Sequence, residues 1–213
     1  YISADYLKMV SSVRVAPSIN IKLYIMLALV LFFVIGCCGA VLLRRLSDIV
    51  DYLLYVDKKT GLPNREKLNI YIGEMAGKVL PEAFTCFTLS LDNLSELTKR
   101  FGYTVGDGVL KDFAGLVQLM GDTEGMRGYN GVGRFVVFFE ECSSKKAAAM
   151  IRILDNQVEE YNSLNPEYPI RYTAAWATTE ETDTYEIREL LRLSQKKWKQ
   201  MEKEKKDKTE EET

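Results

Sequence analysis

The sequence of 213 residues contains no histidine, which excludes a histidine general base and histidine metal ligands. Its 4 cysteines follow no spacing that is typical of a zinc site or a disulfide framework, so we expect buried or reduced thiols. A formal net charge of −2 gives no general attraction to nucleic acid, and none is expected as a partner. The sequence also shows no internal repeat, and residues 1–19 do not have the pattern of a signal peptide.

Charge is missing from one long segment, Leu23–Leu43. A helix of about 20 apolar residues is long enough to cross the hydrocarbon core of a bilayer. We therefore predict a transmembrane helix over residues 20–43, preceded by the end of an extracytoplasmic segment, 1–19. Arg44 and Arg45 favour a cytoplasmic C-terminal side, and hence a single-pass protein of the inner (cytoplasmic) membrane. The alternative is a buried core helix, although such helices rarely stay apolar over this length.

Apolar residues continue beyond this segment at 3-4-3 spacing, at Leu46, Ile49, Leu53 and Val56. The spacing places them on one face of a helix, so we interpret residues 44–57 as a helical linker. Two interpretations stay open. The linker is either a single amphipathic helix or one strand of a parallel coiled-coil stalk, which would make the protein a homodimer. The stripe covers only about two heptads, too few to decide between them by pattern alone.

Helical and strand patterns alternate in the rest of the chain. The predicted strands are 83–91, 169–177 and the two arms of a hairpin around residue 132, and the predicted helices start at residue 65 and then cover 93–100, 107–120, 145–162 and 185–205. The charged residues 207–213 are predicted to be a disordered tail. This order predicts an α+β fold with a mostly antiparallel sheet, related to the ferredoxin-like βααββαβ arrangement.

The hairpin is centred on Gly131-Val132-Gly133-Arg134, between aromatic and β-branched residues. Its glycines suit a tight turn in which the backbone adopts positive φ. The tip offers one cation, Arg134, and no carboxylate. The absence of a carboxylate leaves the tip without the hard oxygen ligand that a divalent cation would need.

Three motifs resemble the GGDEF domain of diguanylate cyclases. Residues 57–65, DKKTGLPNR, match the opening of that family. Residues 101–110, FGYTVGDGVL, resemble its YGHxxGDxxL motif, with Tyr103 where histidine is usual, and residues 173–177 are similar to its SIGxA strand, with Ala175 in place of glycine. The resemblance implies a nucleotidyl-cyclase-like palm over residues 58–206.

The same resemblance implies a reaction that this sequence is poorly equipped to perform. Members of the family join two GTP molecules, each held by one protomer of a dimer, with divalent metal bound by acidic residues. Here Ser90 stands where the first metal-binding Asp belongs, Gly133 replaces the acid of the hairpin, and Arg134 replaces its Glu. Asp92 is the carboxylate left as a candidate metal ligand. A cation at this place repels Mg²⁺, so we expect a degenerate site without catalytic residues.

Five residues are candidates for contacts with a nucleotide: Asp107, Thr98, Asn93, Arg134 and Lys206. Asp107 matches the guanine-contacting Asp of the family, and Thr98 occupies the position of its guanine-contacting Asn. Glu202 replaces a phosphate-binding Lys, while Lys206 keeps a basic residue one turn later. Asp107 can equally be a helix N-cap that needs no ligand.

The other two candidates also have ordinary interpretations. Arg134 can bind a phosphate with two parallel hydrogen bonds, but a lone arginine at a hairpin tip is more often solvated. Asn93 lies in a turn whose backbone N–H groups would face phosphates at a helix N-terminus, and asparagine is also a common helix cap.

These observations favour a membrane-anchored, bacterial-type signalling protein whose degenerate GGDEF domain is inactive and acts by dimerisation or by partner contact. The alternatives are a module that binds GTP without turnover, and a residual cyclase in which Asp92 and substrate phosphates hold one metal. No cofactor is expected, with Mg²⁺ needed only in the cyclase alternative. The expected partners are the lipid bilayer, a second copy of the chain, GTP and a protein of cyclic di-GMP signalling. Because the sequence begins with Tyr1, we expect it to be part of a longer chain.

Overall fold

The computed structural model describes residues 21–121 and 125–211, and for residues 206 and 208–211 the path of the helix only. These residues divide into two compact units, with the boundary between Val50 and Asp51. The predicted extracytoplasmic segment, 1–19, lies outside the described residues.

The N-terminal unit consists of most of α2 (Ile21–Tyr55), a single helix of 35 residues. Its most apolar window has a mean hydropathy of 2.9 and no buried residue. Within the described ranges, α2 is the one helix that is long and apolar enough to cross a membrane. The helix runs without a break through Arg44 and Arg45, and arginine is a good helix former.

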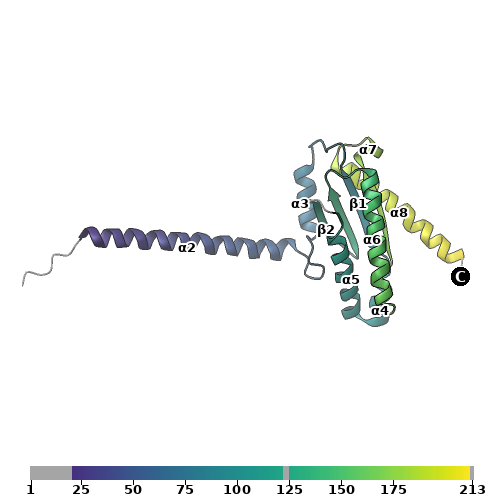
Figure 1. Cartoon of the computed structure of the whole chain (residues 1–213), viewed down its shortest axis with the longest axis horizontal. Coiled ribbons are helices and arrows are strands. Elements are labelled where there is room, and N and C mark those ends of the chain that lie inside the picture. Colours follow the sequence, from purple (N-terminus) through teal and green to yellow (C-terminus); the bar gives the residue numbers. More distant parts are fainter. Residues whose placement is uncertain (1–20, 122–124, 212–213) are drawn as a thin grey trace, which may run out of the picture. The chain divides into compact units, whose positions relative to one another are not determined.

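The second unit is built on a four-stranded sheet (Figure 1). Its strands lie in the order β2-β3-β1-β4, and all neighbours are antiparallel. The strands are β1 (Thr85–Leu91), β2 (Gly125–Gly131), β3 (Arg134–Phe139) and β4 (Tyr172–Thr178). The predicted α+β class, antiparallel sheet and βααββαβ order are therefore confirmed.

Helices cover both faces of this sheet; in Figure 1, α6 passes in front of it and α8 behind it. The helices are α3 (Arg65–Met75), α4 (Leu94–Phe101), α5 (Tyr103–Gln118), α6 (Ser144–Leu164), α7 (Thr179–Thr182) and α8 (Ile187–Glu211). Every residue of β1 is buried, since side chains on one face of the strand pack against α5 and α6, and those on the other face against α3 and α8. Two hydrophobic cores therefore hold the sheet between its helices.

Two helix boundaries differ from those predicted by more than two residues. α5 begins at Tyr103 rather than at residue 107, because Gly102, with φ of 88°, ends α4 and starts α5 in a single step. Asp107 consequently lies inside the helix, and its interpretation as an N-cap is wrong. α8 continues to Glu211, into the region predicted to be a disordered tail. Its lysines and glutamates are good helix formers, which explains the extension.

The turn between α2 and α3 is fixed by two side chains. Asp57 Oδ1 accepts hydrogen bonds from the Lys59 and Thr60 backbone amides, at 3.1 and 2.9 Å. Asn64 caps α3, as predicted, by accepting from the Lys67 backbone amide at 3.1 Å. The Asn64 side chain also donates to the Leu54 carbonyl oxygen at 2.7 Å, and so ties the end of α2 to the start of α3.

The last member of the predicted apolar stripe does not belong to it. Val56 follows the end of α2, and its backbone forms an isolated β-bridge with Pro63. The turn therefore ends the helix one residue before the stripe does. Leu46, Ile49 and Leu53 remain on α2, with exposed fractions of 58%, 56% and 55%.

The hairpin between β2 and β3 turns at Val132 and Gly133, whose φ angles are 51° and 71°. Positive φ at both central residues is the pattern of a type I′ turn, which favours Asn-Gly. The predicted tight turn with positive φ is confirmed at Gly131 and Gly133. Val132 is a strained exception, because a β-branched side chain disfavours this backbone conformation.

Relieving this strain should stabilise the protein. We expect Val132→Asn to raise the free energy of unfolding by about 1 kcal/mol, since asparagine tolerates left-handed backbone. Urea unfolding curves measure the change. Val79→Asn is the matched control, because Val79 is 84% exposed and Val132 87%, and Val79 is not among the described residues with positive φ. Equal stabilisation by both substitutions would show that backbone strain is not the cause.

Candidate functional site

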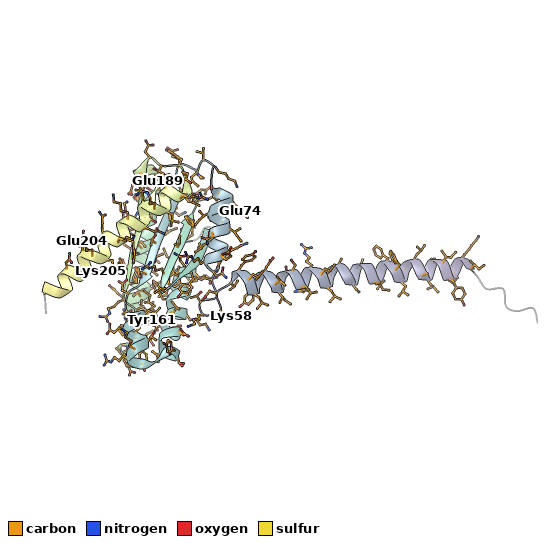
Figure 2. The ribbon with its side chains drawn as sticks, turned by 180° about the vertical axis from the view of Figure 1, so that it is seen from behind. Lys58, Glu74, Tyr161, Glu189, Glu204 and Lys205 are labelled. Atoms are coloured by element: carbon orange, nitrogen blue, oxygen red, sulfur yellow. The ribbon has the colours of Figure 1, made fainter. Side chains whose placement is uncertain are left out.

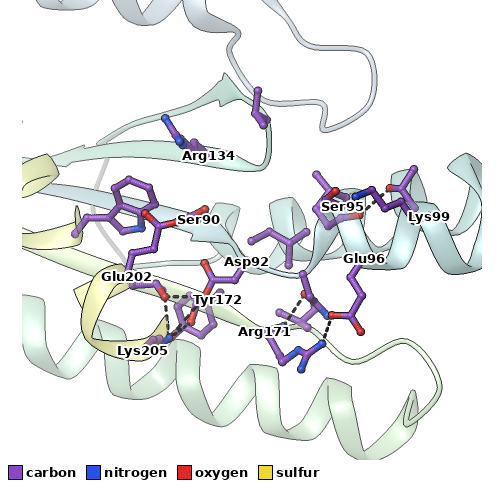
Figure 3. A pocket seen from close by; sticks show the side chains of 18 of the residues that line it. Ser90, Asp92, Ser95, Glu96, Lys99, Arg134, Arg171, Tyr172, Glu202 and Lys205 are labelled. Atoms are coloured by element: carbon purple, nitrogen blue, oxygen red, sulfur yellow. Dashed lines mark hydrogen bonds and ion pairs between the residues drawn. The ribbon is translucent and has the colours of Figure 1, made fainter. Parts of the chain in front are cut away.

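An open cleft of about 1130 Å³ lies where β1 ends and β3 and β4 begin, bordered by α4 and α8 (Figure 3). It brings together five of the predicted metal-site and nucleotide-site positions: Ser90, Asp92, Asn93, Thr98 and Arg134. Asp107 is not among its lining residues. Lys206 lies on α8, and its side chain is outside the described part of the structure, so its predicted phosphate contact is untested.

The two most unusual residues of the site face each other across the sheet. Ser90 of β1 and Arg134 of β3 are register partners, and neither carries a carboxylate. The Arg134 guanidinium lies over the Trp198 ring, with its carbon 4.9 Å from the ring centroid. Arg134 is exposed but not merely solvated, because this cation–π contact holds it over α8.

Asp92, the candidate metal ligand, already has partners within the chain. Its Oδ2 accepts a hydrogen bond from the Thr173 hydroxyl at 2.6 Å and lies 3.7 Å from Lys205 Nζ. Burial raises the pKa of the Asp92 carboxyl, the hydrogen bond from Thr173 and the charge of Lys205 lower it, and the nearby Glu202 carboxylate raises it. A carboxylate in this state is a poor donor for an additional cation.

The residues of the cleft do not fit a divalent metal. Among the side chains that the structure describes, no group of three or more Asp, Glu, Cys or His residues is arranged to hold one. At Gly133, where φ is 71°, an added Cβ would lie 3.2 Å from the Leu91 carbonyl oxygen, which leaves little space for a side chain. Magnesium requires several oxygen ligands in near-octahedral geometry, and one engaged carboxylate does not supply them.

Asn93 serves the backbone rather than the open cleft. It is 4% exposed, its Oδ1 accepts from the Arg171 amide at 3.1 Å, and its Nδ2 donates to the Pro169 carbonyl at 2.7 Å. Asn162 of α6 binds the backbone of Ile170 in a similar way. Its Oδ1 accepts from the Ile170 amide at 2.7 Å, and its Nδ2 donates to the Ile170 carbonyl at 2.9 Å. The two amides hold the segment that leads into β4. The interpretation of Asn93 as a side-chain cap is wrong, because its side chain makes no capping bond to α4.

This clamp predicts a structural effect of substitution. We expect Asn93→Ala to lower the free energy of unfolding by about 2 kcal/mol, because two buried backbone groups lose their partners. Chemical denaturation of the variant measures the loss. Asn130→Ala, at a half-buried asparagine of β2, is the control and should change stability far less. A loss below about 0.5 kcal/mol for Asn93→Ala would contradict the clamp.

Thr98, the other residue predicted to contact guanine, lies where two helices approach closely. Its hydroxyl donates to the Leu94 carbonyl at 2.8 Å within α4. An added Cβ at Gly106 of α5 would lie only 2.3 Å from Thr98 Oγ1, so α4 and α5 meet at this glycine. Thr98 therefore combines a packing role with its place on the wall of the cleft.

Asp107 forms an ion pair with Lys59. Its Oδ1 accepts from Lys59 Nζ at 2.8 Å, and this hydrogen bond raises the pKa of Lys59. Lys59 belongs to the turn after α2, so the pair connects that turn to α5. Both side chains are about half exposed, 55% and 41%, and the pair contributes little to stability.

The sequence interpretation named Glu202 and Lys206 of α8 but missed two other residues of this helix. Trp198 and Lys205 line the cleft together with Glu202. Their spacing of four and three residues places them on one face of a helix. That periodicity is a signal that was present in the sequence, whereas the partner of each side chain depends on the fold.

Comparisons with known proteins agree with this fold. The family model described as "Diguanylate cyclase, GGDEF domain" matches residues 54–208. No curated protein matches the chain. Among solved structures, the chain is similar to the coiled coil and GGDEF domain of DgcB from Caulobacter crescentus in complex with c-di-GMP, with 16% identity and a TM-score of 0.58, over 71% of this chain and 83% of that one.

Two further structures are similar at comparable levels. The FimX GGDEF domain from Pseudomonas aeruginosa shows 18% identity and a TM-score of 0.55, over 67% of this chain and 90% of that one. The S helix-GGDEF-EAL structure of Vibrio cholerae LapD, bound to c-di-GMP, shows 12% identity and a TM-score of 0.53, over 63% of this chain. The match spans only 31% of the LapD chain. Identities this low establish the fold alone.

Proposed function

The chain belongs to the GGDEF domain family of diguanylate cyclases, and we propose that it is a signalling member that has lost the cyclase reaction and acts by dimerisation or by contact with a protein partner. The observation that carries the proposal is the pairing of Ser90 with Arg134 across β1 and β3. An uncharged hydroxyl and a cation meet where a metal-dependent enzyme needs acids.

The chemistry of phosphoryl transfer explains why this pairing matters. Such enzymes rely on positioning and on metal ions that neutralise developing negative charge. Two like charges 4 Å apart repel by about 4 kcal/mol at the effective dielectric constant of a protein surface. Arg134 therefore opposes a divalent cation at this edge of the sheet, and Asp92 is already engaged by Thr173 and Lys205.

Contacts around the turn after α2 support a role in relaying a state. Pro63 of this turn accepts a hydrogen bond from the Tyr129 amide of β2 at 2.8 Å. The Tyr129 hydroxyl in turn accepts from the Gly133 amide at 3.2 Å, at the tip of the hairpin. A displacement at the end of α2 thus has a short bonded route to Arg134, which follows Gly133 in the chain.

The proposal includes membrane anchoring and pairing of two chains. The charge-free residues Leu23–Leu43 of α2 would span the cytoplasmic membrane, with Arg44 and Arg45 and the GGDEF domain on the cytoplasmic side. The exposed Leu46 and Ile49 have the spacing that a second, parallel copy of the helix would cover.

A second candidate function is binding of GTP without turnover. The size of the cleft and its four lining cations, Lys99, Arg134, Arg171 and Lys205, favour it. Residual cyclase activity is the third possibility, and it would require Asp92 to give up its partners for a metal ion.

Incubation with GTP separates these functions. We expect the full chain, purified in detergent, to form no cyclic di-GMP above a protein-free blank with GTP and either Mg²⁺ or Mn²⁺, because the acids that would hold the metal are absent. Chromatography of the products measures this. Asp92→Asn is the matched variant and should behave identically.

Two other outcomes would point elsewhere. Cyclic di-GMP formation that Asp92→Asn abolishes would contradict the proposal and support the residual cyclase. Saturable heat on calorimetric titration with GTP, without any product, would favour the binding module instead.

A further inference from the structure

Helix α8 places a lysine among the acidic groups of the cleft. Figure 2 labels Lys205 toward the end of α8, and Figure 3 shows it beside Asp92 and Tyr172. Lys205 Nζ donates to the Tyr172 carbonyl and to Thr173 Oγ1, both at 2.8 Å, and lies 3.7 Å from Asp92 Oδ2. An ammonium group has three N–H donors, so it can bind both oxygens and still face the carboxylate.

The Thr173 hydroxyl links the carboxylate and the ammonium group into one network. It accepts from Lys205 and donates to Asp92 Oδ2 at 2.6 Å. Because Thr173 is 1% exposed, its hydroxyl is shielded from competing water. The Asp92 and Lys205 side chains are 31% and 55% exposed, so this ion pair is neither fully solvated nor deeply buried.

The surroundings of Asp92 favour a cation beside its carboxylate. Asp92 carries a negative charge in a half-buried place, and the carboxylate of Glu202 lies near enough to raise its pKa as well. The charged groups that line the cleft come from α4, β3, α8 and the segment before β4: Glu96, Lys99, Arg134, Glu202, Lys205 and Arg171. Of these, Arg171 pairs with Glu96 at 2.5 Å, and Arg134 stacks on Trp198.

We propose that Lys205 is the resident cation of the cleft, and that its ammonium group neutralises Asp92 in the role that a bound metal ion has in a metal-dependent site. This inference rests on the proposed loss of the metal centre. It adds that a side chain of α8, which borders the cleft, takes the place of the metal ion. The domain then keeps its structure without divalent ions, and such ions do not bind stably beside Asp92.

A double-mutant cycle tests the inference on the full chain. Both tryptophans, Trp176 and Trp198, lie in the second unit, so thermal unfolding followed by their fluorescence reports on that unit alone. We expect Lys205→Met to lower the unfolding midpoint by about 2–4 °C, the size typical for the loss of one favourable ion pair in a chain of this length. In an Asp92→Asn background the same substitution should cause less than half of that loss, because the charge of Asp92 is gone and only the hydrogen bonds of Lys205 to β4 remain to be lost.

Matched variants and a metal titration complete the test. Lys203→Met, at an exposed lysine of the same helix, should leave the midpoint unchanged. Lys205→Arg keeps the charge and should lose less than half of what the Met variant loses, so the inference stays testable if Asp92→Asn does not fold. Millimolar MnCl₂ should leave the midpoint of the wild type unchanged.

Three results would overturn the inference. An equal loss from Lys205→Met in both backgrounds would mean that Lys205 acts only through its bonds to β4. No loss in the wild-type background would mean that it neutralises nothing. A rise in the wild-type midpoint with MnCl₂ that Asp92→Asn removes would mean that metal displaces it. Because these readouts measure stability and not turnover, this inference and the proposed function can fail separately.

Discussion

The charge balance at the ends of β1 and β3 is the constraint on which the interpretation of this domain depends. A site for divalent cations needs several carboxylates close together, and these repel one another unless a cation is bound. Here the paired positions carry Ser90 and Arg134, and Asp92 is matched by Lys205. The site is electrostatically satisfied by its own chain, so a metal ion would have to displace a cation already in place.

The contacts that hold the scaffold together are made within the chain. Two hydrophobic cores hold the sheet between α5 and α6 on one face and α3 and α8 on the other. Side-chain amides of Asn93 and Asn162 fix the segment that leads into β4. Such contacts do not require a ligand. Under the proposed function, the fold therefore needs no acids at this site, and the turn after α2 stays bonded to β2.

Much of the fold was predictable from the sequence, and the reasons are local. The strands, the hairpin glycines and the capping role of Asn64 follow from periodicity, backbone preference and hydrogen-bonding capacity. The start of α5 was missed because Gly102 allows two helices to follow each other almost without a loop. That error also assigned Asp107 a capping role, whereas the residue lies inside the helix and pairs with Lys59.

The site was less predictable than the fold, because its decisive contacts join residues far apart in the chain. Motif positions identified Ser90 and Arg134 as substitutions, but not the stacking of Arg134 on Trp198. They likewise did not identify Lys205 as the partner of Asp92, since 113 positions separate the two. The helical spacing of the α8 residues was visible, but which strand that face would meet depends on tertiary structure.

The most direct test is a crystal structure of the domain grown with a non-hydrolysable GTP analogue and MnCl₂, with anomalous diffraction measured to locate manganese. We expect no manganese peak beside Asp92, and Lys205 Nζ still within hydrogen-bonding distance of Thr173 Oγ1. Ordered manganese ions between Asp92 and a bound triphosphate, with Lys205 displaced, would contradict this expectation.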